Sequence, residues 1–238
     1  MVWWDLRRGS KKLRDLKGGT HFDFTGTDPQ VRGPMNCVPS GLRAAAYYAV
    51  RALADAVSER VPDAAAGLSV MLAFGGRRND GSPFILSELV AAGTGASAGA
   101  DGVDCLQTDG SNSMNLPLEA LGIDAPIRVL RFGLRADSGG AGYHRGGLGV
   151  VREYEFQAGD IRLTYRGERH FTAARGSTGG GDGAMSKATI FRADGRIETI
   201  ASKCVTTVSR GDRLLVETAG GAGFGDPMTR ARDEVATD

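Results

Sequence analysis

Alternating apolar and polar residues mark the second half of the chain as β-structure. The alternation is clearest in three segments, and a fourth follows the turn Arg210-Gly211-Asp212. Period-two alternation is typical of half-buried strands. Gln157-Ala158-Gly159 predicts a hairpin between the second and third segments, and Ala193-Asp194-Gly195 predicts another hairpin. We therefore expect mainly antiparallel strands from residue 126 onward, including 127–132, 150–156, 161–165 and 213–217.

The first half carries one pattern of helical period. Ser40 is suited to a helix N-cap, and Pro62 marks the end of the pattern. Between them, apolar residues recur at helical spacing at Leu42, Ala46, Ala49, Val50, Leu53, Val57 and Val61. The apolar runs 68–75 and 84–91 fit either short strands or brief helices. The sequence thus predicts an α+β fold with its longest helix at 40–61. Residues 1–125 form a mixed region with a basic arm, residues 126–238 a β-rich region, and together they form one composite domain.

Composition and charge limit the partners. The net charge is +1, which gives no reason to expect a nucleic acid or an acidic membrane surface as a partner. The basic cluster of residues 7–17 includes Asp15 and lacks interleaved aromatic residues, which favours a solvated arm. No run of about 18 apolar residues is present. The sequence contains 36 glycines, about twice the usual share. They cluster between strand-like segments, where they mark loops and turns.

Cysteine, histidine and glycine patterns indicate no cofactor bound by this chain alone. Cys37, Cys105 and Cys204 are far apart and odd in number, which suits a reducing cytoplasm. The three histidines are isolated in sequence, so we expect no metal site. Two glycine-rich segments, 93–98 and 179–184, fit the loose dinucleotide pattern, but neither opens a predicted helix. No P-loop and no Gly-x-Ser-x-Gly elbow is present.

The segment 135–149 combines the most functional residue types. Six glycines are interleaved with Asp137, Ser138, His144 and two arginines, so that amides and guanidinium groups could point into one space and bind an anion or carbonyl oxygen. The alternative is a tight connection between two strands. We expect an ordered, internally hydrogen-bonded loop close to residues 220–227, in which valine at Gly140 or Gly147 would be destabilising if either position has positive φ. Its structural residues are Asp137, Ser138, Gly139, Gly140 and Gly147.

This segment resembles the signature of the hydantoinase B, oxoprolinase and acetone carboxylase family. Three further matches follow the family's order: residues 23–36 with the helix after them, residues 109–119 leading into 125–129, and the ending Glu217 to Pro227. The resemblance covers nearly the whole chain. Family members are longer, and the expectation is that this chain corresponds to the carboxy-terminal half of a B-type subunit, as a split subunit, a truncated frame or a relic.

The resemblance implies ATP-dependent opening of a cyclic amide such as a hydantoin or 5-oxoproline, while some relatives carboxylate ketones. An A-type partner would phosphorylate the substrate carbonyl oxygen with ATP and magnesium, and the B-type part would hydrolyse the activated intermediate. A divalent metal is expected in the amino-terminal half of the B-type subunit, which a separate polypeptide could supply. This chain alone is then not expected to be active.

Five residues are candidates for substrate contacts, namely Asn112, Asn115, Glu119, Arg145 and His170. Each also has a structural interpretation: the asparagines as turn residues, Glu119 at the start of a short helix, Arg145 as a loop brace and His170 as a surface histidine. The function of the chain also has alternative interpretations. A structural module that docks an A-type partner is the main alternative, and an independent ligand-binding β domain is a third.

Overall fold

The structure is a computed structural model that describes residues 14–16, 19–21, 62–67, 70–107 and 116–237. The chain divides into two compact units, Met1–Ala56 and Val57–Asp238. In the first unit only the short antiparallel pair of β1 (Arg14–Leu16) and β2 (Gly19–His21) is described. The helix expected over residues 40–61 lies outside the described residues. All further description concerns the second unit.

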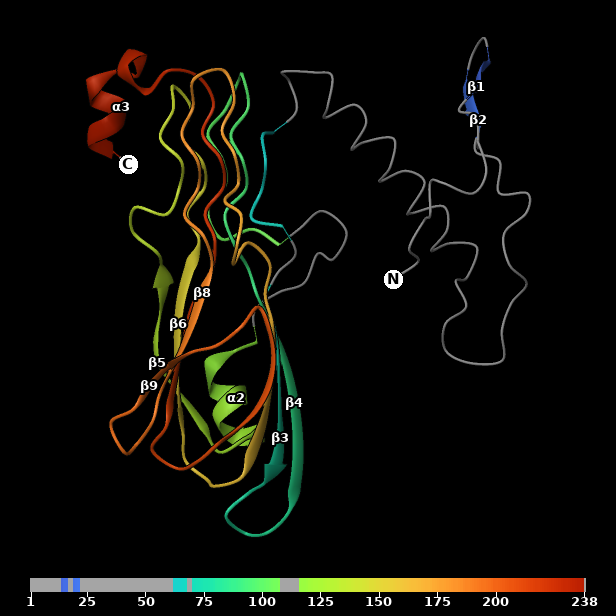
Figure 1. Ribbon diagram of the computed structural model, residues 1–238, viewed down its shortest axis with the longest axis vertical. Helices are drawn as coiled ribbons and strands as arrows, with labels where there is room; N and C mark the ends of the chain where they lie inside the picture. The colour runs from blue at the N-terminus through green and yellow to red at the C-terminus, as the bar shows by residue number, and fades with distance from the viewer. Residues whose placement is uncertain (1–13, 17–18, 22–61, 68–69, 108–115, 238) are drawn as a thin grey trace. The chain divides into compact units, whose positions relative to one another are not determined.

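Two antiparallel sheets form one end of this unit (Figure 1). The four-stranded sheet has the order β10-β7-β3-β4, and the five-stranded sheet has the order β5-β6-β11-β8-β9. The expectation of antiparallel strands after residue 126 is thereby confirmed. The runs around 70 and 85, which periodicity left open, are the paired strands β3 and β4. Strand bounds are β3 Val70–Arg77, β4 Pro83–Val90, β5 Ile127–Leu134, β6 Val150–Phe156, β7 Ile161–Arg166, β8 Lys187–Phe191, β9 Ile197–Thr199, β10 Lys203–Val208 and β11 Arg213–Glu217.

The described helices are short. α2 (Leu118–Asp124) packs against β5 and buries Leu121, whereas α3 (Arg232–Thr237) follows the short 3-10 helix η1 (Pro227–Thr229). The described residues are thus mostly antiparallel sheet with few helices. No helix among them is long and apolar enough to cross a membrane.

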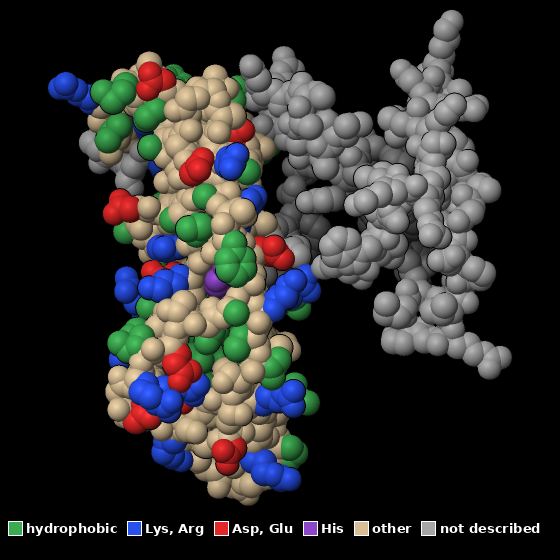
Figure 2. All heavy atoms as spheres, in the orientation of Figure 1, with side chains coloured by type: hydrophobic (Ala, Val, Ile, Leu, Met, Phe, Trp, Pro, Cys, Tyr) green, Lys and Arg blue, Asp and Glu red, His purple; other side chains and the backbone are tan. Residues whose placement is uncertain are grey.

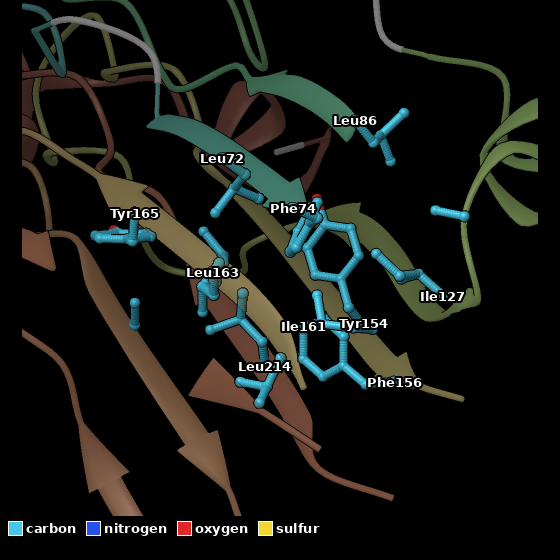
Figure 3. Packing of buried hydrophobic residues seen from close by; sticks show 14 of the residues in the cluster. Leu72, Phe74, Leu86, Ile127, Tyr154, Phe156, Ile161, Leu163, Tyr165 and Leu214 are labelled. Atoms are coloured by element: carbon cyan, nitrogen blue, oxygen red, sulfur yellow. The ribbon is translucent and has the colours of Figure 1, made fainter. Parts of the chain in front are cut away.

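The main hydrophobic core lies between the two sheets (Figure 3). Phe74 of β3 packs against Tyr154 and Phe156 of β6, with ring centroids 5.6 Å and 5.8 Å apart. Leu163 of β7 and Leu214 of β11 are fully buried in the same cluster. Burial of such side chains contributes about 1.5–3 kcal/mol each, so the alternating residues of each strand hold the two sheets together.

One expected hairpin is present and the other is not. The turn around Gly195 joins β8 to β9, with the Arg192 amide donating to the Arg196 carbonyl at 2.8 Å. The hairpin expected at 157–159 was wrong, because β6 belongs to the five-stranded sheet and β7 to the other. Alternation shows which face of a strand is apolar but not which strand lies beside it. The 157–160 segment therefore crosses from one sheet to the other.

Glycine-rich segments with little regular secondary structure extend beyond the sheets (Figure 1). The segment 218–223 is buried, and backbone hydrogen bonds join it to four others. The Ala222 amide donates to Ala64, the Gly93 amide to Ala219, the Gly140 amide to Gly221 and the Gly220 amide to Ala184, at 2.9–3.1 Å. We call these packed segments, residues 63–66, 92–104, 138–149, 174–184 and 218–225, the glycine bundle.

Glycine is required in this bundle because the backbones lie too close for side chains. A Cβ at Gly146 would lie 2.0 Å from the Gly221 carbonyl oxygen, and one at Gly221 would lie 1.7 Å from the Thr94 carbonyl oxygen. The segment 93–102 is therefore largely a packed element of the bundle. On the surface, charged side chains of both signs are interspersed with small apolar groups over the visible face (Figure 2).

Candidate functional site

The loop 137–149 is internally bonded and packed against the carboxy-terminal segment, as expected. Ser138 Oγ donates to the Arg135 carbonyl at 2.6 Å and accepts from the Gly149 amide at 2.9 Å, and His144 forms a backbone bridge with Phe224. Close approach of backbones, and not positive φ, accounts for Gly140 and Gly147. Neither Gly140 nor Gly147 has positive φ; Asp137 has it, at 55°. Close backbone approach is what excludes a side chain at Gly140, where a Cβ would lie 2.2 Å from the Gly181 oxygen.

Arg145 lies on this loop and braces it. Its Nη1 donates to Asp104 Oδ1 at 2.9 Å, and the same carboxylate oxygen accepts from the Leu148 amide at 2.7 Å. The carboxylate therefore ties the 101–105 segment to both sides of Gly146. This bracing matches the structural interpretation of Arg145. A role in anion binding stays a prediction.

The other candidates are dispersed. Asn112 and Asn115 lie outside the described residues. Glu119 is exposed in the first turn of α2. His170 lies in the connection after β7, and neither Arg145 nor Glu119 is among the residues that line the cleft around it. The described candidates thus do not form one cluster, and of them His170 lines this cleft.

His170 is held by a tyrosine. Its Nε2 lies 2.8 Å from the Tyr165 hydroxyl, and the two rings meet edge to face. Burial lowers the pKa of His170, so the imidazole is neutral near pH 7. Burial raises the pKa of Tyr165 far above its ordinary value, so Tyr165 stays a phenol. Gly167 permits this contact, because a Cβ there would lie 2.5 Å from the tyrosine hydroxyl oxygen and 2.8 Å from Nε2.

The residue before His170 has an uncommon backbone conformation. Arg169 has φ of 59°, in the left-handed region that non-glycine residues seldom adopt. Its guanidinium donates to the carbonyl oxygens of Ala65 and Ala173, each at 3.1 Å. Such conformations cost about 1–3 kcal/mol and concentrate at functional sites. Two side-chain hydrogen bonds thus hold the loop in the conformation that turns His170 into the cleft.

The cleft has a volume of about 410 Å³, which is within the usual range for small-molecule sites, roughly 300–1,000 Å³. Arg135 supplies a fixed charge: it donates to the Met185 carbonyl at 2.7 Å and lies 3.6 Å from Glu217. Lys187 is exposed and makes no ion pair in the described part of the chain. The lining residues are Arg135, His170, Phe171, Met185, Ser186, Lys187, Thr199, Ile200, Ala201 and Ser202.

The structure places the side chains and glycine segments that the sequence raised for metal and nucleotide binding. No group of three or more His, Cys, Asp or Glu side chains gathers among them. Residues 93–98 and 179–184 pack backbone to backbone in the glycine bundle rather than opening a helix towards a phosphate.

Sequence reasoning missed Tyr165 and Lys187, and it placed Arg135 only within the 135–149 loop, not beside His170. Tyr165 was assigned only to a strand, and its partner follows five residues later, so proximity along the chain was the available signal. Arg135 and Lys187 lie far apart in sequence and meet at the cleft only because β5 and β8 belong to one sheet. No local pattern could have joined them.

The fold and the cleft can now be compared with known proteins. The sequence matches the hydantoinase B/oxoprolinase family over residues 12–56 and 49–227, so the chain belongs to that family. It is 28% identical to 5-oxoprolinase 1 of Arabidopsis thaliana over 88% of this chain, which corresponds to 20% of that protein.

Two solved structures share the fold. The ATP-dependent caprolactamase from Pseudomonas jessenii has a TM-score of 0.66 at 24% identity, covering 79% of this chain and 34% of that one. Nucleotide-free acetone carboxylase has a TM-score of 0.64 at 23% identity, covering 73% of this chain and 28% of that one. The chain thus spans between a fifth and about a third of the length of these relatives.

Proposed function

We propose that this chain supplies a substrate-binding part of a B-type subunit in an ATP-dependent hydrolase of cyclic amides. The substrate would be activated by an A-type ATPase partner, in the cytoplasm. The observation that carries the proposal is the His170 cleft in a member of the hydantoinase B/oxoprolinase family. Hydantoins, 5-oxoproline and other lactams are the substrate class, with ketones as the class used by carboxylating relatives.

The cleft suits a small ring with one polar edge. Phe171, Met185 and Ile200 offer apolar walls, while Ser186 and Ser202 offer hydroxyls. Apolar walls with a few placed polar groups are the usual composition of small-molecule sites. A cyclic amide has a flat apolar ring and one amide edge, and so matches this lining.

His170 would contact the amide or its activated oxygen. With Tyr165 as the donor to Nε2, the neutral imidazole carries its proton on Nδ1 and can donate it to a carbonyl oxygen. Nδ1 makes no hydrogen bond within the described residues. Tyr165 would thus be a positioning residue that selects the tautomer of His170.

Arg135 and Lys187 would add positive charge for an anionic group. A carboxylate on the substrate, or the phosphate that an A-type partner places on its carbonyl oxygen, would be attracted to this side of the cleft. Phosphorylation of the carbonyl oxygen makes the amide carbon electrophilic, so water can add to it; the ring C–N bond then breaks, with a proton passing to the nitrogen, to give an acyl phosphate. A second water hydrolyses the acyl phosphate to a carboxylate and inorganic phosphate. ATP, magnesium and any divalent metal would be held by the A-type partner and by an amino-terminal B-type polypeptide.

Reconstitution tests the proposal. The chain is combined with an A-type ATPase and an amino-terminal B-type polypeptide, and substrate-dependent ADP release is measured with hydantoin and 5-oxoproline. We expect release from the complete mixture and none from this chain alone. Substrate-dependent ADP release by the purified chain would contradict the assignment of ATP use to an A-type partner. An inactive complete mixture would contradict the hydrolase assignment.

A non-catalytic assembly module is the second candidate function. The bracing of the 137–149 loop by Arg145 and Asp104 favours it, because these side chains serve the fold of the glycine bundle. The His170→Leu variant separates the two functions. A reconstituted complex that keeps its KM and kcat with this variant would support the assembly module.

A further inference from the structure

Strand β5 forms an open edge of the five-stranded sheet. Among the described strands it pairs only with β6. Phe132 and Leu134 lie opposite Arg152 and Val150, which are buried, so their side chains are on the inner face of the sheet. They are nevertheless 42% and 49% exposed. At this end of β5, two apolar residues of the inner face are thus left uncovered by the described part of the chain.

A buried arginine lies beneath this edge. The Arg152 side chain has no exposed surface, and its guanidinium carbon is 4.8 Å from the centre of the Phe132 ring. Nη2 forms an ion pair with Glu88 of β4 at 2.5 Å, and Glu88 also accepts a 2.6 Å hydrogen bond from Tyr154. Nε and Nη1 of Arg152 are buried without a hydrogen-bond partner in the described structure. Buried donors without acceptors are unfavourable, so an acceptor that enters at this edge would be stabilising.

The charged residues of β5 favour one kind of strand as its partner. The strand carries Arg128 and Arg131 and no acidic residue. Arg128 is ion-paired with Glu155, whereas Arg131 has no ion pair in the described part of the chain. Two copies of β5 placed edge to edge would bring arginines together, which is unfavourable. A strand that carries carboxylates would instead be attracted.

A bulge shortens the available edge. The register between β5 and β6 shifts between Val129 and Arg131. Bulges and edge charges are devices that protect a sheet from indiscriminate pairing. Here they leave a short edge, Arg131 to Leu134, whose inner face is apolar. Its outer face carries Arg131, opposite Glu153 of β6, whose charge is already paired with Arg213 at 2.7 Å.

We propose that the Arg131–Leu134 edge of β5 binds an extended acidic segment of a partner protein by strand addition. Backbone hydrogen bonds would extend the sheet by one strand. Apolar side chains of the incoming segment would cover Phe132 and Leu134, and its carboxylates would face Arg131. A backbone or side-chain oxygen entering beside Phe132 would also give Arg152 an acceptor.

Synthetic peptides test this on the full chain. One peptide alternates valine with glutamate, which matches an apolar inner and an acidic outer face, and the control alternates valine with lysine. Fluorescence anisotropy should show binding of the glutamate peptide at least about tenfold tighter than the lysine peptide, which corresponds to roughly 1.4 kcal/mol. Amide hydrogen exchange should slow at β5 only.

Three variants test which residues of the edge are responsible for peptide binding. Leu134→Glu should abolish binding, because it places a charge on the apolar face. Val205→Glu, at an exposed position of the edge strand β10 in the other sheet, should leave binding unchanged. Arg131→Glu should reverse the preference towards the lysine peptide. Melting temperatures near that of the parent chain show that each variant is folded.

Three outcomes would overturn the proposal. These are equal affinity for both peptides, no binding of either, or exchange protection at β10 in place of β5. A dimer that Leu134→Glu dissociates would show that a second copy occupies the edge instead.

Discussion

The amide of Gly221 donates a hydrogen bond to the carbonyl oxygen of Gly147 at 2.9 Å, and thereby joins the centre of the glycine bundle to the 137–149 loop. Neither residue could carry a side chain without moving a neighbouring backbone. The stability of the bundle therefore depends on the absence of side chains at Gly147 and Gly221. This dependence can be measured.

Gly147→Ala should destabilise the chain. The added Cβ would lie 2.1 Å from the Val103 carbonyl oxygen, and overpacking of a filled interior costs about 1–3 kcal/mol or more. Chemical denaturation of the variant checks this value. Gly159→Ala is the matched control, because a Cβ there meets nothing within 4 Å; its free energy of unfolding should stay within about 0.5 kcal/mol of the parent. Equal stabilities for both variants would contradict the packing argument.

Thr218→Val should destabilise the chain although it preserves the side-chain volume. Thr218 Oγ1 accepts from the Val150 amide at 2.7 Å and donates to the Ala91 carbonyl at 2.9 Å, and the residue is fully buried. Valine would leave both backbone groups unpaired, at a cost of about 1–3 kcal/mol. Thr218→Ser keeps the hydroxyl and should retain more of the stability. Thermal unfolding of both variants tests the order, and a serine variant weaker than the valine variant would contradict it.

Acid should weaken the attachment of the carboxy-terminal helices. Asp101 accepts two hydrogen bonds from Arg230, at 2.9 Å and 2.8 Å, and these lower its pKa below the ordinary 3.8. A carboxyl whose pKa is depressed in the folded state stabilises the fold above its unfolded pKa and loses this contribution as pH falls through the folded value. The Asp101 contribution should therefore be complete above about pH 5, decline as pH falls through the ordinary pKa and disappear below the lower pKa of the folded state.

Asp101→Asn is the control for this pH dependence. It should lower the free energy of unfolding at pH 7 and flatten its decline between pH 5 and the acid limit. Denaturation curves across that interval compare the two chains. An unchanged slope in the variant would show that Asp101 does not titrate with folding.

His170→Leu should impair substrate binding in the reconstituted complex. Loss of one hydrogen bond to the substrate costs about 0.5–1.5 kcal/mol, and so raises KM by about two- to tenfold. Tyr165→Phe should give a smaller increase, because it releases the imidazole without removing it. His144→Gln is the matched control, since His144 contacts Asp101 outside the cleft. Steady-state ADP release measures all three variants, and a KM effect of His144→Gln equal to that of His170→Leu would contradict the assignment.

Much of the β-structure could be predicted from local pattern. Residues 150–156 and 213–217 alternate because one face of each strand packs in the core, and that alternation is visible in the sequence. In 127–134 the same alternation predicted the strand, although only Ile127 on its inner face is fully buried. The turn at Gly195 was equally visible, since it needs a positive φ, which is 90° here. The connection 157–160 was mistaken for a hairpin because a turn sequence does not specify whether the chain returns to the same sheet.

The candidate site was less predictable. His170 was identified through the family resemblance, but its partner Tyr165 and its neutral state follow from burial that only the folded chain has. Arg152 and Glu88 were not selected at all. They lie on strands of different sheets, and their pairing depends on how those sheets pack.

The sequence by itself determined the family, the alternation of the strands and the clustering of glycine, because each can be recognised from the order of residues alone. The tertiary structure decided why the glycines are there. Neither Gly140 nor Gly147 adopts positive φ, and at both positions the carbonyl of a distant segment occupies the space that a Cβ would need. That distance between backbones is set by the packing of five segments, which no single segment encodes. The same is true of the cleft, where β5 and β8 bring Arg135 and Lys187 to the imidazole of His170.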